Sequence, residues 1–155
     1  AYLSGYQDNR PVRIGNGSAK AVELDIYGRL IVAADEYYTR YDFMPPRVWE
    51  KLSSIADHVC QAWRRPDHGI WSCRASSRHY VSSKVYCWLA LDRAIRLATR
   101  LGQQVPHRWS EEREILHRTI CEQGFDSRAK SFVRAFVSRE LNSSALLIAV
   151  TDFLP

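Results

Sequence analysis

Apolar side chains recur every three or four residues through most of this chain, which is the period of an amphipathic helix. The first run of this kind predicts a helix over Ser18–Tyr41. Its apolar face would be formed by Val22, Ile26, Leu30, Ala34 and Tyr38. Three more apolar residues, Tyr27, Ile31 and Tyr37, widen this face, so we expect the helix to be buried on more than one side.

The same period predicts three further helices, over Arg47–Trp63, Ser82–Leu101 and Ser110–Gly124. Pro45 and Pro46 end the first helix and preset the second, because proline fixes φ and suits a first helical turn. Gly102 follows the third helix, where a left-handed residue commonly closes a helix. Ser110 is predicted as the N-cap of the fourth helix and is followed by acidic residues, which the helix dipole favours.

The remaining segments lack a helical period. Phe132–Val137 is strand-like, and Asn142–Val150 is predicted as a short buried helix. Tyr2–Asn16 and Arg64–Gly69 contain the glycines and prolines of loops. With 155 residues, 46% of them apolar and 25% charged, the chain has the balance of one domain, residues 1–155. We therefore predict an all-α fold of antiparallel helical hairpins.

Charge and cysteine content narrow the functional classes. The net charge of +5 permits nucleic-acid binding, but basic residues are spread among acidic ones, so a nucleic-acid partner is not expected. No apolar run reaches the roughly 20 residues of a membrane span, and we expect a cytoplasmic protein with no membrane partner. The cysteines (Cys60, Cys73, Cys87 and Cys121) lack CxxC spacing and are expected to be reduced thiols. Neither a metal site nor a cofactor is predicted.

Short motifs follow one another in a recognisable order along almost the whole chain. They are Gly5-Tyr6, Arg10–Asn16, Glu23–Gly28, Trp63–Trp71, Arg74, Arg78-His79, Ser83-Lys84, Trp88–Ala94, Ser131–Val133, Leu141 and Phe153–Pro155. This order resembles bacterial members of glycoside hydrolase family 15, the glucoamylase- and trehalase-like inverting α-glycosidases. The resemblance implies part of an (α/α)6 toroid, a double ring of helices with its pocket at the loop end. The chain would then be truncated relative to the full ring.

The chemistry of this family requires two carboxyl groups, a general acid and a general base about 6.5 to 9.5 Å apart. In the resemblance the acid is a Glu directly after Gly-Ile-Trp, and that position is Ser72 here. A serine hydroxyl has too high a pKa to act as a general acid near neutral pH. The base lies in the family beyond Pro155, so both catalytic roles are expected to be empty. Other family carboxylate positions hold Asn142 and Arg65, and an expected Gln is Ala21.

The resemblance also implies a substrate-binding set around Ser72. Its members are Arg13, which matches an arginine that holds sugar hydroxyls, and Asp67, Trp71, Arg74 and Lys84. Trp71 equally suits a core position, and Asp67 suits a turn cap before His68-Gly69. A solvated helix end would account for Lys84 just as well as a pocket position.

Two further acids sit on apolar helices without implying catalysis. Asp25 and Asp92 each have an arginine four residues on, Arg29 and Arg96, so an intrahelical ion pair or a buried hydrogen-bond anchor is the better explanation.

Three functions remain open on this basis. The favoured one is a fragment or degenerate copy of an α-glycosidase domain that binds an α-linked glucose oligosaccharide or trehalose and is inactive as written. The second is a competent glycosidase completed by a homo-oligomer or by sequence absent here, because a partial ring would expose apolar faces that seek a partner. The third is a non-enzymatic helical binding module.

Overall fold

The computed structural model describes residues 4–12, 15, 21–70 and 76–154, and its main elements are helices. The α-helices are α1 (Asp25–Tyr41), α2 (Pro46–Ala62), α3 (Val81–Arg100) and α4 (His107–Gly124). The shorter described elements are the 3-10 helices η1 (Tyr6–Asp8) and η3 (Ser143–Val150) and an antiparallel pair of strands, β1 (Phe125–Asp126) and β2 (Ser131–Phe132). The predicted all-α fold of helical hairpins is confirmed. None of the helices in these ranges has both the length and the apolar character needed to cross a membrane.

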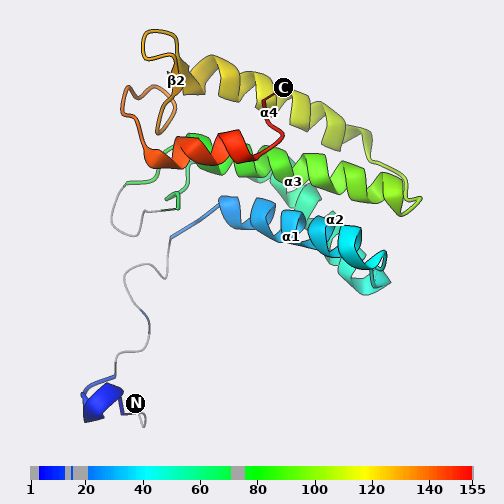
Figure 1. Cartoon of the computed structure of the whole chain (residues 1–155), viewed down its shortest axis with the longest axis horizontal. Coiled ribbons are helices and arrows are strands. Elements are labelled where there is room, and N and C mark those ends of the chain that lie inside the picture. Colours follow the sequence, from blue (N-terminus) through cyan, green and yellow to red (C-terminus); the bar gives the residue numbers. More distant parts are fainter. Residues whose placement is uncertain (1–3, 13–14, 16–20, 71–75, 155) are drawn as a thin grey trace.

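Helix α3 is the centre of the molecule and contacts α1, α2, α4 and η3 (Figure 1). The turns that join α1 to α2 and α3 to α4 lie at one end of the bundle, and segments 63–70, 76–80 and 125–142 gather at the other end. Backbone hydrogen bonds connect these segments: Val81 donates to the Arg134 carbonyl at 3.1 Å, and Phe136 donates to the His79 carbonyl at 2.9 Å. The segments that carry the central family motifs therefore share one end of the helices.

Small residues allow α3 to lie close to its neighbours. Ala90, Ala94 and Ala98 recur every four residues on α3 and are fully buried. The backbone of α1 approaches α3 closely at Gly28, where a Cβ atom would lie 2.0 Å from the Tyr86 carbonyl oxygen. Larger side chains fill the core around them, among them Ile31 and the α4 residues Trp109, Leu116 and Ile120.

The apolar face predicted for the first helix is largely wrong. Val22, Ile26 and Leu30 are 49%, 55% and 49% exposed. The line of α1 that faces α3 is instead formed by Asp25, Gly28, Ile31, Asp35 and Tyr38. Arginines of α3 supply partners for Asp35, so that a polar residue is accommodated inside where periodicity alone predicts an apolar one.

Several predicted boundaries also shift. Helix α1 begins at Asp25 and not at Ser18, because the backbone of Val22 and Leu24 is bonded to the turn at residues 67–68. Helix α4 begins at His107, directly after Pro106, so Ser110 lies inside the helix and is not its N-cap.

The two segments near the C-terminus are less regular than predicted. The predicted strand Phe132–Val137 is reduced to β2, and residues beyond it bond singly to residues 79–81. The predicted helix Asn142–Val150 is the 3-10 helix η3, in which Ile148 is buried but Leu146 and Val150 are exposed.

Candidate functional site

The loop that carries position 72 is closed at its base by two backbone hydrogen bonds. Asp67 N–H donates to the Arg78 carbonyl at 2.9 Å, and Arg78 N–H donates to the Asp67 carbonyl at 2.8 Å. This antiparallel bridge brings together the end of the segment after α2 and the approach to α3. The two ends of the loop, on either side of position 72, are thus held together by backbone hydrogen bonds.

Asp67 anchors this loop to the start of α1. Its carboxylate is fully buried, and Oδ2 accepts hydrogen bonds from the backbone N–H groups of Leu24 and Gly69, each at 3.2 Å. The bond to Gly69 is the turn cap predicted from the Asp-His-Gly sequence. The bond to Leu24 joins residues 43 positions apart and was not predicted. The other carboxylate oxygen, Oδ1, is buried without a hydrogen-bond partner in the part of the chain that the structure describes.

The two residues after Asp67 continue the same connection. His68 pairs with Val22 through its backbone N–H, at 2.8 Å, and through Nδ1, which accepts from Val22 N–H at 3.1 Å. Gly69 has a left-handed φ of +64°, and a Cβ atom there would lie 2.8 Å from the Tyr80 ring. A glycine is therefore required at this position on both conformational and steric grounds.

Lys84 lies in the interior at the first turn of α3. It is fully buried, and its Nζ donates a hydrogen bond of 2.6 Å to the Arg65 carbonyl. Burial lowers the pKa of the ammonium group, against the opposing Coulombic influence of Cys87 and Asp67. The alternative that Lys84 belongs to a solvated helix end is wrong.

His79 is electrostatically coupled to the same residues. Its ring stacks on Phe136 with centroids 5.8 Å apart. Partial burial lowers the pKa of His79, and the positive charge of Lys84 lowers it further, whereas Asp67 raises it. Asp67, His79 and Lys84 therefore form one electrostatic unit at the base of the loop.

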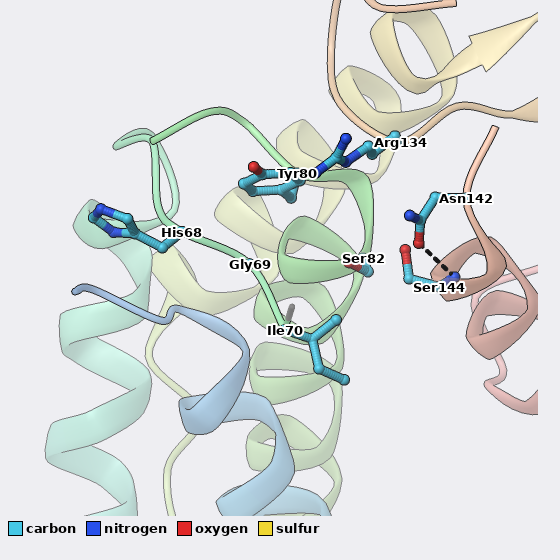
Figure 2. A pocket seen from close by; sticks show the side chains of 8 residues that line it. All are labelled: His68, Gly69, Ile70, Tyr80, Ser82, Arg134, Asn142 and Ser144. Carbon is cyan, nitrogen blue, oxygen red and sulfur yellow. Dashed lines mark hydrogen bonds between the residues drawn. The ribbon is translucent and has the colours of Figure 1, made fainter. Parts of the chain in front are cut away.

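A small pocket lies beside this unit (Figure 2). Its lining residues are His68, Gly69, Ile70, Tyr80, Ser82, Arg134, Asn142 and Ser144. The cavity volume is about 10 Å³, enough for about one water molecule and too small for a sugar ring. The pocket brings the segment immediately before position 72 together with Asn142, about 70 residues further along the chain.

Asn142 also has a local structural role. Its side-chain oxygen accepts a hydrogen bond of 2.9 Å from Ser144 N–H and caps η3, as the dashed line in Figure 2 indicates. An aspartate, which the resemblance implies at this position, could accept the same bond. The change to Asn therefore preserves the cap and removes a negative charge from the pocket.

The predicted site residues divide into two groups. Asp67 and Lys84 lie fully buried in the two segments on either side of the loop, and the negative charge of Asp67 raises the pKa of Lys84. Arg13, Trp71, Ser72 and Arg74 lie outside the described residues, so the substrate-binding set stays a prediction.

The sequence reasoning missed Tyr80, Ser82, Arg134 and Ser144 as pocket residues. No pattern in the sequence indicates Arg134 as a pocket residue, because only the backbone hydrogen bonds between residues 134–136 and 79–81 bring it to the pocket. In the described ranges, no cluster of three or more His, Cys, Asp or Glu side chains is arranged to hold a metal ion.

The carboxylates on apolar helices behave differently from one another. Asp25 forms the predicted ion pair with Arg29, with Oδ2 and Nε 2.8 Å apart. The predicted Asp92–Arg96 pair is wrong: Asp92 bonds to Arg113 at 3.0 Å and to the adjacent Arg93, whereas Arg96 reaches across to Asp35 on α1.

The described thiols are structural. Cys60, Cys87 and Cys121 are free among the described residues, and Cys73 lies outside them, so the reduced state of the cysteines stays a prediction. Burial raises the pKa of Cys60 to about 11 and that of Cys87 to about 12. Burial raises the pKa of Cys121 as well. None of these thiols is poised for nucleophilic chemistry at neutral pH.

Comparisons with known proteins agree with the motif order. The model of the family described as "Glycosyl hydrolases family 15" matches residues 2–155. A trehalase of Mycobacterium tuberculosis is 37% identical over 155 residues, which are 99% of this chain and 23% of that protein. A trehalase of Thermoplasma volcanium is 30% identical over 152 residues, covering 97% of this chain and 24% of that protein.

Trehalase 1 of Sulfolobus acidocaldarius is 34% identical over 158 residues, covering 99% of this chain and 26% of that protein. This chain thus spans about a quarter of the length of the curated relatives it matches. No solved structure matches it significantly.

Proposed function

Because this chain belongs to glycosyl hydrolase family 15, we propose that it is a partial or degenerate α-glycosidase domain that binds trehalose or an α-linked glucose oligosaccharide and does not hydrolyse it. The observation that carries this proposal is the family match over residues 2–155. The structure also places Gly69-Ile70, which precede position 72, and Asn142 around one small pocket. In the family resemblance, position 72 holds the general-acid Glu and position 142 holds an Asp. The hairpins would form part of the family's (α/α)6 ring.

Loss of turnover follows from Ser72. Inverting hydrolysis needs a group that gives a proton to the departing glycosidic oxygen, and a serine hydroxyl cannot do this near neutral pH. Removing a general acid costs typically 10²- to 10⁴-fold in rate. Asp67 does not replace the missing acid, because both of the backbone donors that it accepts from hold it at the base of the loop.

Sugar binding is the property that remains to be tested. The full chain is titrated with trehalose, maltose and glucose while the indole N–H signals of its tryptophans are followed by NMR, and a Trp71→Phe variant assigns the Trp71 signal. We expect saturable shifts of that signal and no release of glucose from trehalose or maltose. No shift with any of the sugars at tens of millimolar would refute retained binding, and glucose release that survives in Ser72→Ala would refute the inactive site.

A second function is favoured by one specific observation. Ile26, Leu30 and Tyr37 are 55%, 49% and 45% exposed, so α1 presents a largely exposed apolar stripe. A glycosidase completed by further copies or by further sequence would cover this stripe. Light scattering of the purified chain tests completion by copies: a monomer at concentrations where the sugar titration is performed would exclude it.

A further inference from the structure

Two opposite charges are buried together at the base of the loop that leads to position 72. Asp67 belongs to the segment after α2, and Lys84 belongs to the first turn of α3; both side chains have 0% exposure. Neither is a typical interior residue, because charged groups are rarely buried fully unless they are paired or bonded. Their position requires an explanation beyond packing.

Lys84 occupies a place that is unfavourable for a cation. The N-terminal turn of a helix carries partial positive charge, so an ammonium group there is repelled, and burial removes its hydration. The compensating contact is the 2.6 Å hydrogen bond to the Arg65 carbonyl, which lies just past the C-terminal end of α2, where the partial charge is negative. Lys84 therefore links the end of one helix to the start of the next.

Asp67 makes the complementary connection. One oxygen accepts from both Leu24 and Gly69, which ties the approach to α1 to the turn before position 72. The remaining oxygen is buried and accepts no hydrogen bond from the described residues. The negative charge of Asp67 raises the pKa of Lys84, and the pKa of His79 is lowered by Lys84 and raised by Asp67.

We propose that Lys84 and Asp67 are positioning residues. Their hydrogen bonds hold the backbone of residues 65–69, the segment that precedes Trp71 and Ser72 in the sequence. We call this set of hydrogen bonds the clamp. The two residues act through this backbone and do not contact the sugar. This inference rests on the proposed function for its consequence, sugar binding, but the clamp itself is a property of the chain without sugar.

The clamp is tested first by amide hydrogen exchange in the full chain without sugar. Lys84→Met removes the ammonium group and keeps the length of the side chain, and Lys51→Met on the exposed face of α2 is the matched control. We expect the Gly69 amide to exchange about 10-fold faster or more in Lys84→Met, because a hydrogen bond to a charged group is lost. The amide of Leu97, in the middle of the core, should keep its wild-type rate in both variants.

Unchanged exchange at Gly69 in a folded Lys84→Met protein would overturn the proposal. Parallel acceleration at Gly69 and Leu97 would also overturn it, because that result indicates a loss of global stability and not of a local clamp. Should Lys84→Met fail to fold, Asp67→Asn decides the question. It keeps an oxygen for Leu24 and Gly69 and removes the charge, so we expect several-fold faster exchange at Gly69 with a melting temperature close to wild type; an unchanged rate at Gly69 would overturn the clamp.

The sugar readout separates the two proposals. In the trehalose titration, we expect the dissociation constant of Lys84→Met to rise about 10-fold, and that of Lys51→Met to equal the wild-type value. A wild-type chain that binds no sugar contradicts the proposed function, and amide exchange then decides the clamp alone. Equal trehalose affinity in wild type and folded Lys84→Met contradicts the positioning role.

Discussion

The contact between α1 and α3 depends on the missing side chain of Gly28. A Cβ atom at this position would lie 2.0 Å from the Tyr86 carbonyl oxygen and 2.6 Å from its carbonyl carbon. Ordinary carbon–oxygen contacts are no shorter than about 3.3 Å. Both colliding atoms belong to the backbone of α3, so no side-chain rotation can relieve the clash. Gly28→Ala must therefore separate the two helices by more than about 1 Å.

The size of the effect is a difference between two opposing terms. Alanine in place of glycine inside a helix stabilises the helix by about 1 kcal/mol. Overpacking a buried contact costs typically about 1 to 3 kcal/mol, and a clash between two backbones belongs at or above the upper end of this range. The expected net loss is about 2 kcal/mol. For a chain of this length, it lowers the melting temperature by about 4 to 8 °C.

Urea denaturation followed by circular dichroism measures this difference. The matched control is Ala33→Gly on the exposed side of the same helix, which reports the propensity term alone and should cost about 1 kcal/mol. A Gly28→Ala protein as stable as wild type, or more stable, would refute the close approach of α1 to α3. A loss of about 2 kcal/mol, opposite in sign to the propensity term, supports it.

Four other predictions concern titratable groups that are buried or partly buried. Asp35→Ala should cost about 2 to 4 kcal/mol in urea denaturation, because this carboxylate, 1% exposed, faces three arginines of α3 that keep partial access to solvent; a loss below about 1 kcal/mol contradicts the pairing. Cys60 and Cys87 should resist iodoacetamide at pH 8 until the chain unfolds, since burial raises both pKa values, and mass spectrometry of pulse-labelled protein would expose an error as early labelling. The pKa of Lys84 is lowered in the folded state, so its charged form opposes folding. Stability of wild type relative to Lys84→Met should therefore rise as pH increases through the folded pKa toward the unfolded value near 10.5, and a difference that is flat or falling with pH in this window contradicts the assignment. In the same variant the NMR titration of His79 should move to higher pH, and an unmoved midpoint would mean that Lys84 carries no charge near it.

Local signals in the sequence were sufficient to predict the position of most of the helices. The second and third helices were predicted over Arg47–Trp63 and Ser82–Leu101 and occur at Pro46–Ala62 and Val81–Arg100. Gly102 has the predicted left-handed conformation, with φ of +65°. These features depend on proline geometry, glycine freedom and a period of 3.6 residues, which act within a few residues of one another.

The turn at Asp67 was predicted only in part. The Asp-His-Gly sequence indicates a local bond from Gly69 to the aspartate, and this bond is present. The second bond, from Leu24, depends on where α1 is placed, and the same long-range pairing delays the start of α1 to Asp25. A sequence pattern carries no information on a partner 43 residues away.

Which side of α1 is buried was decided by tertiary structure alone. Ile26 and Leu30 have the stronger apolar signal, yet Asp35 and Gly28 face the core, because arginines of α3 neutralise the carboxylate and the glycine allows the backbones to meet. Lys84 illustrates the same principle. The sequence cannot tell a buried lysine in a first helical turn from a solvated one, because the partner of Lys84, the Arg65 carbonyl, is brought to it only by the fold. The sequence by itself determined the helices and their family. Only the tertiary structure decided which charged side chains are buried, because a charge can be buried only where the fold brings a partner to it.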